Sequence, residues 1–190
     1  MDHKNSTDQD LVAAALKDRH AFAALVERYE SPLARYVRRL GADIELTKDV
    51  LQESFIKAYV NLNDYDSSLS FSAWIYRIVH NETVSQFRKQ RVRPITLERK
   101  EDLALFDKIP DELNLLTEAD ARLTQAAVQD ALKVLENNYR DILILRFFEE
   151  KSYDEISDIL KIPAGTVATH LNRGKAKLKE ILKKNQTIGV

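Results

Sequence analysis

Helix-breaking residues are scarce in this chain, and their scarcity limits the folds that it can adopt. The 190 residues include only four glycines and four prolines. Average usage gives about 23 such residues in a chain of this length. Sheet proteins need frequent turns that carry glycine or proline, so a sandwich or a barrel is disfavoured. The sequence therefore predicts an all-α protein built from few, long helices.

Composition narrows the class of protein further. Hydrophobic residues make up 44% of the chain, which is enough for a core and too much for a disordered chain. The absence of cysteine excludes disulfides, cysteine-ligated metal sites and thiol catalysis. The start MDHKNSTDQD is polar and acidic, unlike a signal peptide, and no apolar run approaches the roughly 18 residues of a membrane span. We therefore expect a cytoplasmic protein without membrane insertion.

Hydrophobic periodicity divides the chain into two helical blocks. Through residues 1–93 the apolar side chains recur in steps of three and four, and Pro94 ends that pattern. Residues 94–117 contain two prolines and show weak periodicity, and residues 94–124 carry four basic and eight acidic groups. We expect two small helical domains, residues 1–93 and residues 118–190, joined by an acidic flexible linker at 94–117.

Local signals predict where helices of the first block begin and end. Ser31 and Pro32 have the pattern of an N-cap followed by proline at the first helical position. Gly41 suits the residue that follows a helix end. Further helices are expected over residues 46–62 and from residue 71 to about 92, with a polar loop between them.

Near the C-terminus the chain has the pattern of a helix-turn-helix. Ser152 and Glu155 form a capping box that opens one helix, and Pro163 prevents that helix from continuing. A second helix is predicted from Gly165 and Thr166 onward. Its candidates for burial are Val167, Leu171, Leu178 and Leu182. Two helices joined by a short turn, the second with a basic exposed face, indicate DNA binding.

The charge of this segment agrees with a nucleic-acid partner. Residues 161–190 carry seven basic side chains, and Glu180 is their one acidic counterpart. The second helix of such a motif enters the major groove with its N-terminal half, where polar side chains reach base edges. Lysines farther along would lie near phosphates and add affinity without sequence information. The simpler alternative is a helical hairpin with a solvated lysine face.

Three segments resemble parts of one known family, and from the first to the last they span residues 49–180, which is most of the chain. IPAGTVATHLNRGKAKLKE resembles region 4 of the extracytoplasmic-function (ECF) group of the sigma-70 family. DVLQESFIKAYVNL resembles region 2.2, and FSAWIYRIVHNETVSQFRK resembles regions 2.3–2.4. The resemblance implies a bacterial sigma factor, which is not itself an enzyme. It would direct promoter recognition and DNA melting by core RNA polymerase, in the cytoplasm.

For region 2 the resemblance implies two sets of functional residues. The first set would bind the clamp helices of core polymerase, and it comprises Asp49, Gln52 and Glu53. The second would bind the melted −10 element, with an asparagine at a flipped base, an aromatic ring for stacking and three cations at phosphates. In that order these are Asn81, Tyr65, Arg77, Arg88 and Lys89.

For region 4 the resemblance implies recognition of the −35 element. Thr169, His170 and Arg173 would read bases, and Thr166 and Lys175 would lie near phosphates. The sequence departs from the family pattern at Ala168 and His170, where cations are common. We therefore expect either an unusual −35 preference or an apolar contact of Ala168 with a thymine methyl. The family also implies an anti-sigma partner and a linker that runs toward the nascent RNA.

Two other functions remain open from the residues themselves. One is a stand-alone helix-turn-helix regulator, which would dimerise and bind a palindrome without polymerase. The other is a metal-dependent enzyme, but the four histidines are scattered and no HExxH or carboxylate–histidine cluster occurs: they are His3, His20, His80 and His170. We predict no catalytic residues, no cofactor and no metal site.

Overall fold

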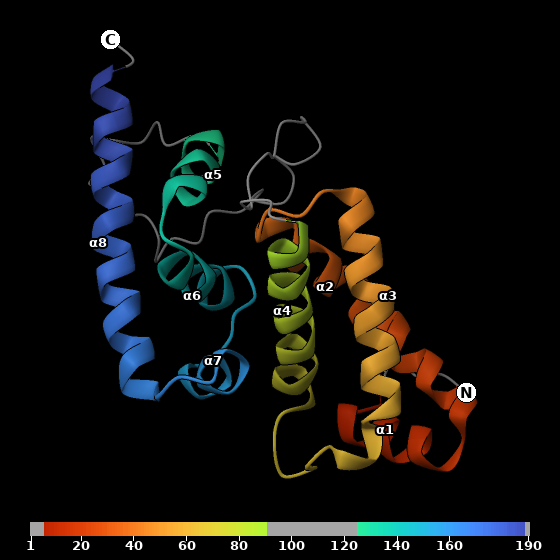
Figure 1. Ribbon diagram of the computed structural model, residues 1–190. Helices are drawn as coiled ribbons and strands as arrows, with labels where there is room; N and C mark the ends of the chain where they lie inside the picture. The colour runs from red at the N-terminus through yellow and green to blue at the C-terminus, as the bar shows by residue number, and fades with distance from the viewer. Residues whose placement is uncertain (1–5, 91–124, 189–190) are drawn as a thin grey trace. The chain divides into compact units, whose positions relative to one another are not determined.

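The computed structural model describes residues 6–90 and 125–188, which fold into eight α-helices and two short 3-10 helices (Figure 1). No strand occurs among these residues, so the prediction of an all-α fold is confirmed. Within the same ranges, no helix has both the length and the apolar character needed to cross a membrane. The predicted linker at 94–117 lies outside the described residues.

The chain divides into two compact units, which contain most of residues 1–93 and most of residues 94–190. The first unit carries four α-helices and two 3-10 helices. They are α1 (Asp8–Lys17), η2 (Arg19–Ala21), α2 (Phe22–Arg39), α3 (Ile44–Val60), η3 (Leu62–Asp64) and α4 (Phe71–Gln90). Helix α3 packs along α4, and the core between the helices includes Leu33, Val50 and Val79, each fully buried.

Helix α2 differs from the sequence prediction, because it runs without a break through Pro32. The predicted helix start at Ser31 is therefore wrong. Proline inside a helix costs about 3 kcal/mol, since it removes one hydrogen bond and crowds the preceding turn. Buried side chains on both sides of it, Tyr29, Leu33 and Tyr36 among them, favour one continuous helix. Burial of each such side chain contributes roughly 1.5–3 kcal/mol, which outweighs the cost of the proline.

The second unit contains α5 (Gln125–Val134), α6 (Asn137–Phe147), α7 (Tyr153–Leu160) and α8 (Ala164–Ile188). Helix α8 packs on α5 and on α6. Its four predicted core residues, Val167, Leu171, Leu178 and Leu182, are all buried, as expected. These side chains hold α8 against its neighbours by one face and leave the opposite face to solvent.

Gly174 lies at a close approach of α8 to α6. A Cβ atom at this position would lie 3.3 Å from the Cβ of Tyr139 and 3.4 Å from Cδ1 of Leu143. Contacts of that length are closer than most side chains tolerate, so a larger residue would push the helices apart. Gly174 thus permits the close packing that fixes α8 on α6.

The start and end of α7 follow the local sequence closely. The backbone N–H of Glu155 donates to Oγ of Ser152, and the Ser152 N–H donates to the Glu155 carboxylate. The predicted capping box is therefore confirmed. The helix ends at Lys161, which adopts the left-handed conformation with φ of 55°.

The turn between α7 and α8 is closed by two short hydrogen bonds. The hydroxyl of Ser157 donates to the carbonyl of Ile162 at 2.6 Å. The backbone N–H of Thr166 donates to the carbonyl of Pro163 at 2.8 Å. Together they set the direction in which α8 leaves the turn, so the predicted helix-turn-helix is present.

Candidate nucleic-acid interface

In the first unit, the C-terminal part of α3 and the exposed side of α4 surround an open hollow of about 370 Å³. Five of the residues that line it stand on α4 at helical spacing, which places them on one side of that helix. The lining residues are Lys57, Asn61, Trp74, Ile78, Asn81, Glu82 and Ser85. Asn81, predicted to capture a base, is exposed in this hollow with its amide able to donate and accept.

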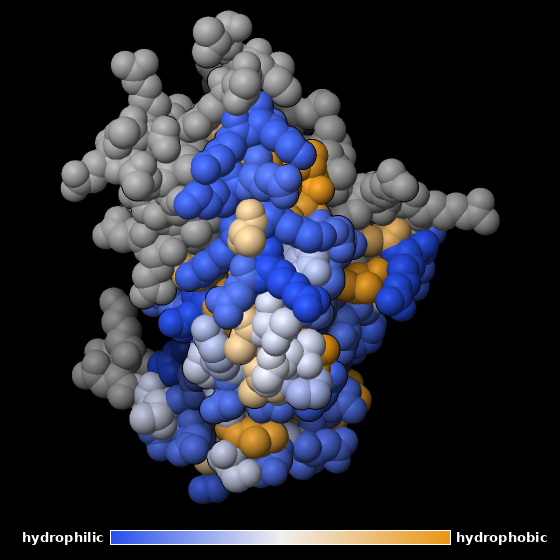
Figure 2. Space-filling model, turned by 90° about the vertical axis from the view of Figure 1, so that its left-hand side faces the viewer, coloured by the Kyte–Doolittle hydropathy of each residue, from blue (hydrophilic) through white to orange (hydrophobic). Residues whose placement is uncertain are grey.

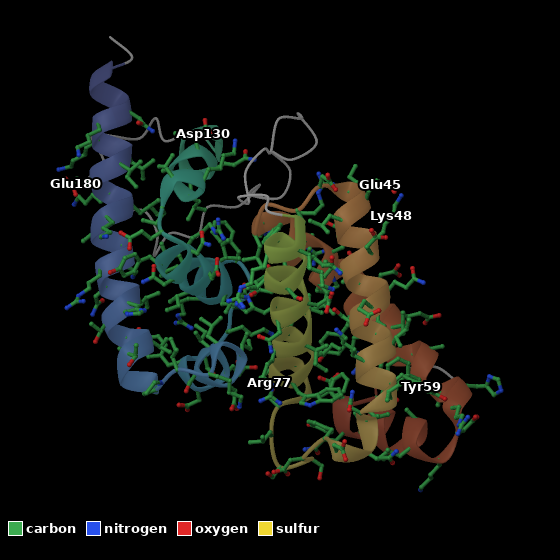
Figure 3. The ribbon with its side chains drawn as sticks, viewed as in Figure 1. Glu45, Lys48, Tyr59, Arg77, Asp130 and Glu180 are labelled. Atoms are coloured by element: carbon green, nitrogen blue, oxygen red, sulfur yellow. The ribbon has the colours of Figure 1, made fainter. Side chains whose placement is uncertain are left out.

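The predicted cations of α4 flank this residue along the helix. At about 3.6 residues per turn, Arg77, Asn81 and Arg88 fall nearly on one line along the helix. Arg88 and Lys89 are exposed in the last turns, and Arg77, labelled in Figure 3, is half-buried. Four of the five residues predicted for the −10 element therefore lie on one helix, three of them positively charged, and Asn81 is the one that lines the hollow.

Tyr65 is the fifth, and its surroundings differ from those of a free stacking ring. It is only 8% exposed, and its hydroxyl donates to the carbonyl of Leu69 at 2.5 Å. Its ring lies 5.4 Å from that of Phe71 and 5.3 Å from that of Trp74, between centroids. Tyr65 thus secures the loop before α4, and a stacking role for it stays a prediction. Trp74 is half-buried and lines the hollow.

A charge pair that sequence reasoning missed joins α3 to α4 at the hollow. Nζ of Lys57 donates to Oε2 of Glu82 at 2.5 Å, and Nε2 of Gln86 donates to Oε1 at 2.7 Å. Burial alone would raise the pKa of Glu82, but these hydrogen bonds outweigh it and hold the pKa below its ordinary value. The carboxylate is therefore ionised at neutral pH. The two partners are 25 residues apart, and no local pattern shows that they meet.

The outer face of α3 carries the residues predicted to bind core polymerase. Asp49 and Gln52 are exposed, and Glu53 is half-buried with its carboxylate 3.4 Å from Nζ of Lys57. Two aliphatic side chains on the same face were missed by the sequence analysis: Ile56 is 51% exposed and Val60 is 67% exposed. The face is therefore acidic toward the start of the helix and apolar toward its end.

In the second unit, four of the five residues predicted for the −35 element share one side of α8. They are Thr166, Thr169, His170 and Arg173, of which Thr169 and Arg173 are exposed. The hydroxyl of Thr169 donates to the carbonyl of Gly165 at 2.9 Å, so its oxygen is left to accept a hydrogen bond. Figure 2 shows α8 from its outer side, hydrophilic over its C-terminal part and paler over its first turns.

Lys175 lies about half a turn away from those four residues. It is half-buried, and its Nζ stands 4.7 Å from the centroid of the Phe147 ring on α6. Lys177 also turns toward α6, where it pairs with Glu136 and stands 4.6 Å from the centroid of the Tyr139 ring. The hydrogen bond to Glu136 raises the pKa of Lys177 above its ordinary value. Two lysines of the basic segment thus fasten α8 to α6, and the phosphate contact predicted for Lys175 stays a prediction.

Among the described residues, no group of three or more histidine, aspartate or glutamate side chains is placed to hold a metal ion. The candidate site brings together hydrogen-bonding and charged side chains, which are the kinds of group that contact phosphates and base edges. It has two parts, one in each unit: the hollow between α3 and α4, and the exposed side of α8.

Comparison with known proteins assigns the chain to a family. Residues 25–93 match the family described as Sigma-70 region 2, and residues 125–178 match Sigma-70, region 4. The ECF RNA polymerase sigma factor SigW of Bacillus subtilis is 32% identical over 170 residues, which are 87% of this chain and 91% of SigW. The RNA polymerase sigma-H factor of Pseudomonas aeruginosa is 31% identical over 184 residues, 92% of this chain and 93% of that protein.

The solved structures agree with the sequence relatives. CnrH, solved in complex with the cytosolic domain of CnrY, superposes with a TM-score of 0.69 at 26% identity and covers 93% of this chain and 97% of CnrH. The sigma factor RpoE from Bartonella quintana shares the fold, with a TM-score of 0.61 at 22% identity, covering 85% of this chain and 96% of RpoE. The chain therefore belongs to the sigma-70 family, and within it to the ECF sigma factors.

Proposed function

We propose that this protein directs bacterial core RNA polymerase to promoters and opens the DNA there, with a separate nucleic-acid surface in each unit. Sigma factor function in transcription initiation follows from its family. The assignment of a separate nucleic-acid surface to each unit rests on one observation. The first unit has the exposed amide of Asn81 in a hollow, whereas the second unit exposes one side of helix α8. We infer that the chain is not an enzyme and acts in the cytoplasm, where core polymerase is found.

The hollow of the first unit suits a base that has left the stack. Asn81 offers both a donor and an acceptor to a base edge, and Trp74 offers part of an aromatic surface. Arg77, Arg88 and Lys89 supply positive charge along the same helix for the neighbouring phosphates. Capture of an unstacked base offsets the few kcal/mol lost when it leaves the duplex. Binding energy at the hollow would therefore favour the melted −10 element.

The exposed side of α8 suits intact duplex. Its N-terminal half presents Thr169, His170 and Arg173 from one side, as a helix in the major groove requires. Arginine pairs with two acceptors on guanine, so Arg173 is the residue expected to contribute most to −35 selectivity. The backbone N–H groups at the start of α8 favour a nearby phosphate, which is the contact proposed for Thr166.

Protein partners are expected at the outer face of α3. Asp49, Gln52 and Glu53 can meet cations of core polymerase, and the exposed Ile56 and Val60 add apolar area to the same face. An anti-sigma partner is also proposed. It is supported by the likeness to CnrH, which was solved in complex with the cytosolic domain of CnrY.

Run-off transcription tests this function directly. Purified core polymerase and the full chain are mixed with a promoter library, and transcripts that begin at defined positions are expected only when both are present. The competing function, a dimeric regulator, predicts that the chain alone protects a palindrome and that core polymerase gains no promoter selectivity. That second result would refute the proposal.

A further inference from the structure

The buried carboxylate of Glu82 is a feature of the hollow that DNA melting does not by itself require. Its side chain is only 4% exposed, yet it is part of the lining of the hollow. A negative charge at a DNA-facing surface repels phosphate, and burying it costs free energy. Part of that cost is offset because the carboxylate links α3 to α4 through Lys57. The remaining question is why an acidic group stands here rather than an amide.

The carboxylate retains capacity to accept further hydrogen bonds. Lys57 donates to Oε2 and Gln86 donates to Oε1. An ionised carboxylate offers about four lone-pair sites, so these two donors leave about two of them for another group. Because the pKa of Glu82 is held below its ordinary value, the group acts only as an acceptor at neutral pH. An acceptor with free lone pairs in a hollow that suits a base discriminates among bases.

We propose that Glu82 is a base-selecting residue, which accepts a hydrogen bond from the exocyclic amine of the base held in the hollow and so disfavours thymine there. This inference rests on the proposed melting function. Cytosine, adenine and guanine carry such an amine, whereas thymine carries the acceptor O4 and a methyl group. A carboxylate facing O4 brings two acceptors together. Asn81, whose amide both donates and accepts, does not impose this choice.

The first experiment compares base selection by two holoenzymes. Core polymerase with the full chain transcribes a library randomised through the −10 element, in which each member carries a barcode downstream of the start site, and the barcodes in the transcripts identify the non-template sequences that were used. We expect thymine to be depleted at one position with the wild-type chain. Glu82→Gln, whose amide can donate to O4, is expected to raise thymine there by about 5- to 100-fold, which is the range for one base-edge contact.

The second experiment removes the amine from the DNA instead of the carboxylate from the protein. At the position found above, purine replaces adenine or 2-pyrimidinone replaces cytosine, which deletes only the exocyclic amine. Wild-type holoenzyme is expected to form about 5- to 100-fold fewer open complexes on the altered promoter. The Glu82→Gln holoenzyme is expected to lose less, because its contact is no longer specific for a donor.

Glu45→Gln is the matched control, since it removes an acidic group from α3 far from the hollow. Glu45 is exposed and pairs with Lys48 at 2.9 Å at the N-terminal end of the helix, as Figure 3 shows. Its holoenzyme should select the same sequences as wild type. Unfolding temperatures of all three chains are measured in parallel. If Glu82→Gln does not fold, the amine deletion tested on wild-type holoenzyme still refutes the proposal when open-complex formation is unchanged.

Two results would overturn the proposal. Either a folded Glu82→Gln chain depletes thymine as strongly as wild type, or deletion of the amine leaves open-complex formation unchanged. Glu82 would then be only a link between α3 and α4. If the proposed sigma factor function itself were wrong, the result would differ from both of these. Wild-type holoenzyme would then give no promoter-dependent transcript from any member of the library.

Discussion

The two units present their nucleic-acid-facing residues in different ways. In the first unit the hollow lies between two helices, and some of its polar groups are already hydrogen-bonded, as in the Lys57–Glu82–Gln86 group. In the second unit a single helix exposes Thr169 and Arg173 directly to solvent. There two lysines, Lys175 and Lys177, stand over aromatic rings on the supporting helix α6.

This difference matches the shape of what each unit is proposed to bind. An unstacked base is small and flat, and a recess with fixed donors and acceptors can surround it. A duplex is convex, and a protruding helix can enter its major groove. On this proposal, specificity in the first unit depends on the packing of α3 against α4. In the second unit it depends on the angle of α8, which its packing on α6 maintains.

The largest effect is expected from Gly174→Val, which tests whether the units are stable independently. The added side chain collides with Tyr139 and Leu143 and should destabilise the second unit by about 1–3 kcal/mol. Trp74 is the chain's one tryptophan and belongs to the first unit, so its fluorescence reports that unit alone. The midpoint of chemical unfolding should shift when unfolding is followed by circular dichroism, and it should stay unchanged when unfolding is followed by Trp74 fluorescence. Equal shifts in both signals would show that the units unfold together.

Gly165→Val is the matched control for that variant. No atom lies within 4 Å of a Cβ atom built at Gly165, so the same change of residue meets open space. Its free energy of unfolding, followed by circular dichroism, should stay within about 0.5 kcal/mol of the wild-type value, which is the range usual for surface substitutions. A shift as large as that of Gly174→Val would mean that loss of glycine, and not the collision with α6, causes the destabilisation.

A second pair of variants separates the proposed tasks of the units. Arg173→Ala should weaken initial holoenzyme binding to promoters with a −35 element by about 1–3 kcal/mol, since it removes a base-edge contact. Asn81→Ala should leave initial binding intact and lower the yield of open complexes. Permanganate reactivity of melted thymines and binding to duplex promoter measure the two steps. The division of tasks is refuted if each variant impairs both steps equally.

Ser54→Ala should stabilise the first unit by about 0.5–1 kcal/mol. Oγ of Ser54 is buried in α3 and has no hydrogen-bond partner among the described residues. Its removal eliminates the cost of burying an unpaired hydroxyl, and alanine is the better helix former. Unfolding followed by Trp74 fluorescence measures the gain. A loss of stability instead would show that the hydroxyl is bonded in solution.

The smallest effect is expected from Lys175→Gln, which tests the orientation of this lysine over Phe147. Each phosphate contact contributes about 0.9 to the slope of log affinity against log salt concentration. Holoenzyme carrying Lys175→Gln should keep the wild-type slope, whereas Arg88→Gln, which removes a proposed phosphate contact, should lower it by about 0.9. An equal decrease for both variants would show that Lys175 leaves the ring and contacts phosphate.

Features that depend on nearby residues could be predicted from the sequence. The capping box at Ser152 and Glu155 joins positions three apart, and the core face of α8 follows from helical spacing. The family resemblance added the placement of Asn81, which the structure puts in the hollow. These signals are contained in short windows, and the helix-turn-helix and the all-α class were therefore accessible.

Features that depend on tertiary packing could not be predicted in the same way. The N-cap signal at Ser31 and Pro32 was overridden by the buried stripe of α2. Lys175 carried a charge typical of phosphate contacts, but the sequence does not show that it faces Phe147. Glu82 meets Lys57 only when α3 packs on α4. In each case a partner distant in sequence decides the orientation of the side chain.

The hydrogen bonds around the α7–α8 turn have a consequence for the rate at which the motif forms. They join residues three to five positions apart: Ser152 with Glu155, Ser157 with Ile162, and Pro163 with Thr166. Contacts so close in sequence require little loop-closure entropy and form within microseconds or faster. The direction of α8 can therefore be restored by local chain motion each time the turn opens, before the rest of the unit rearranges.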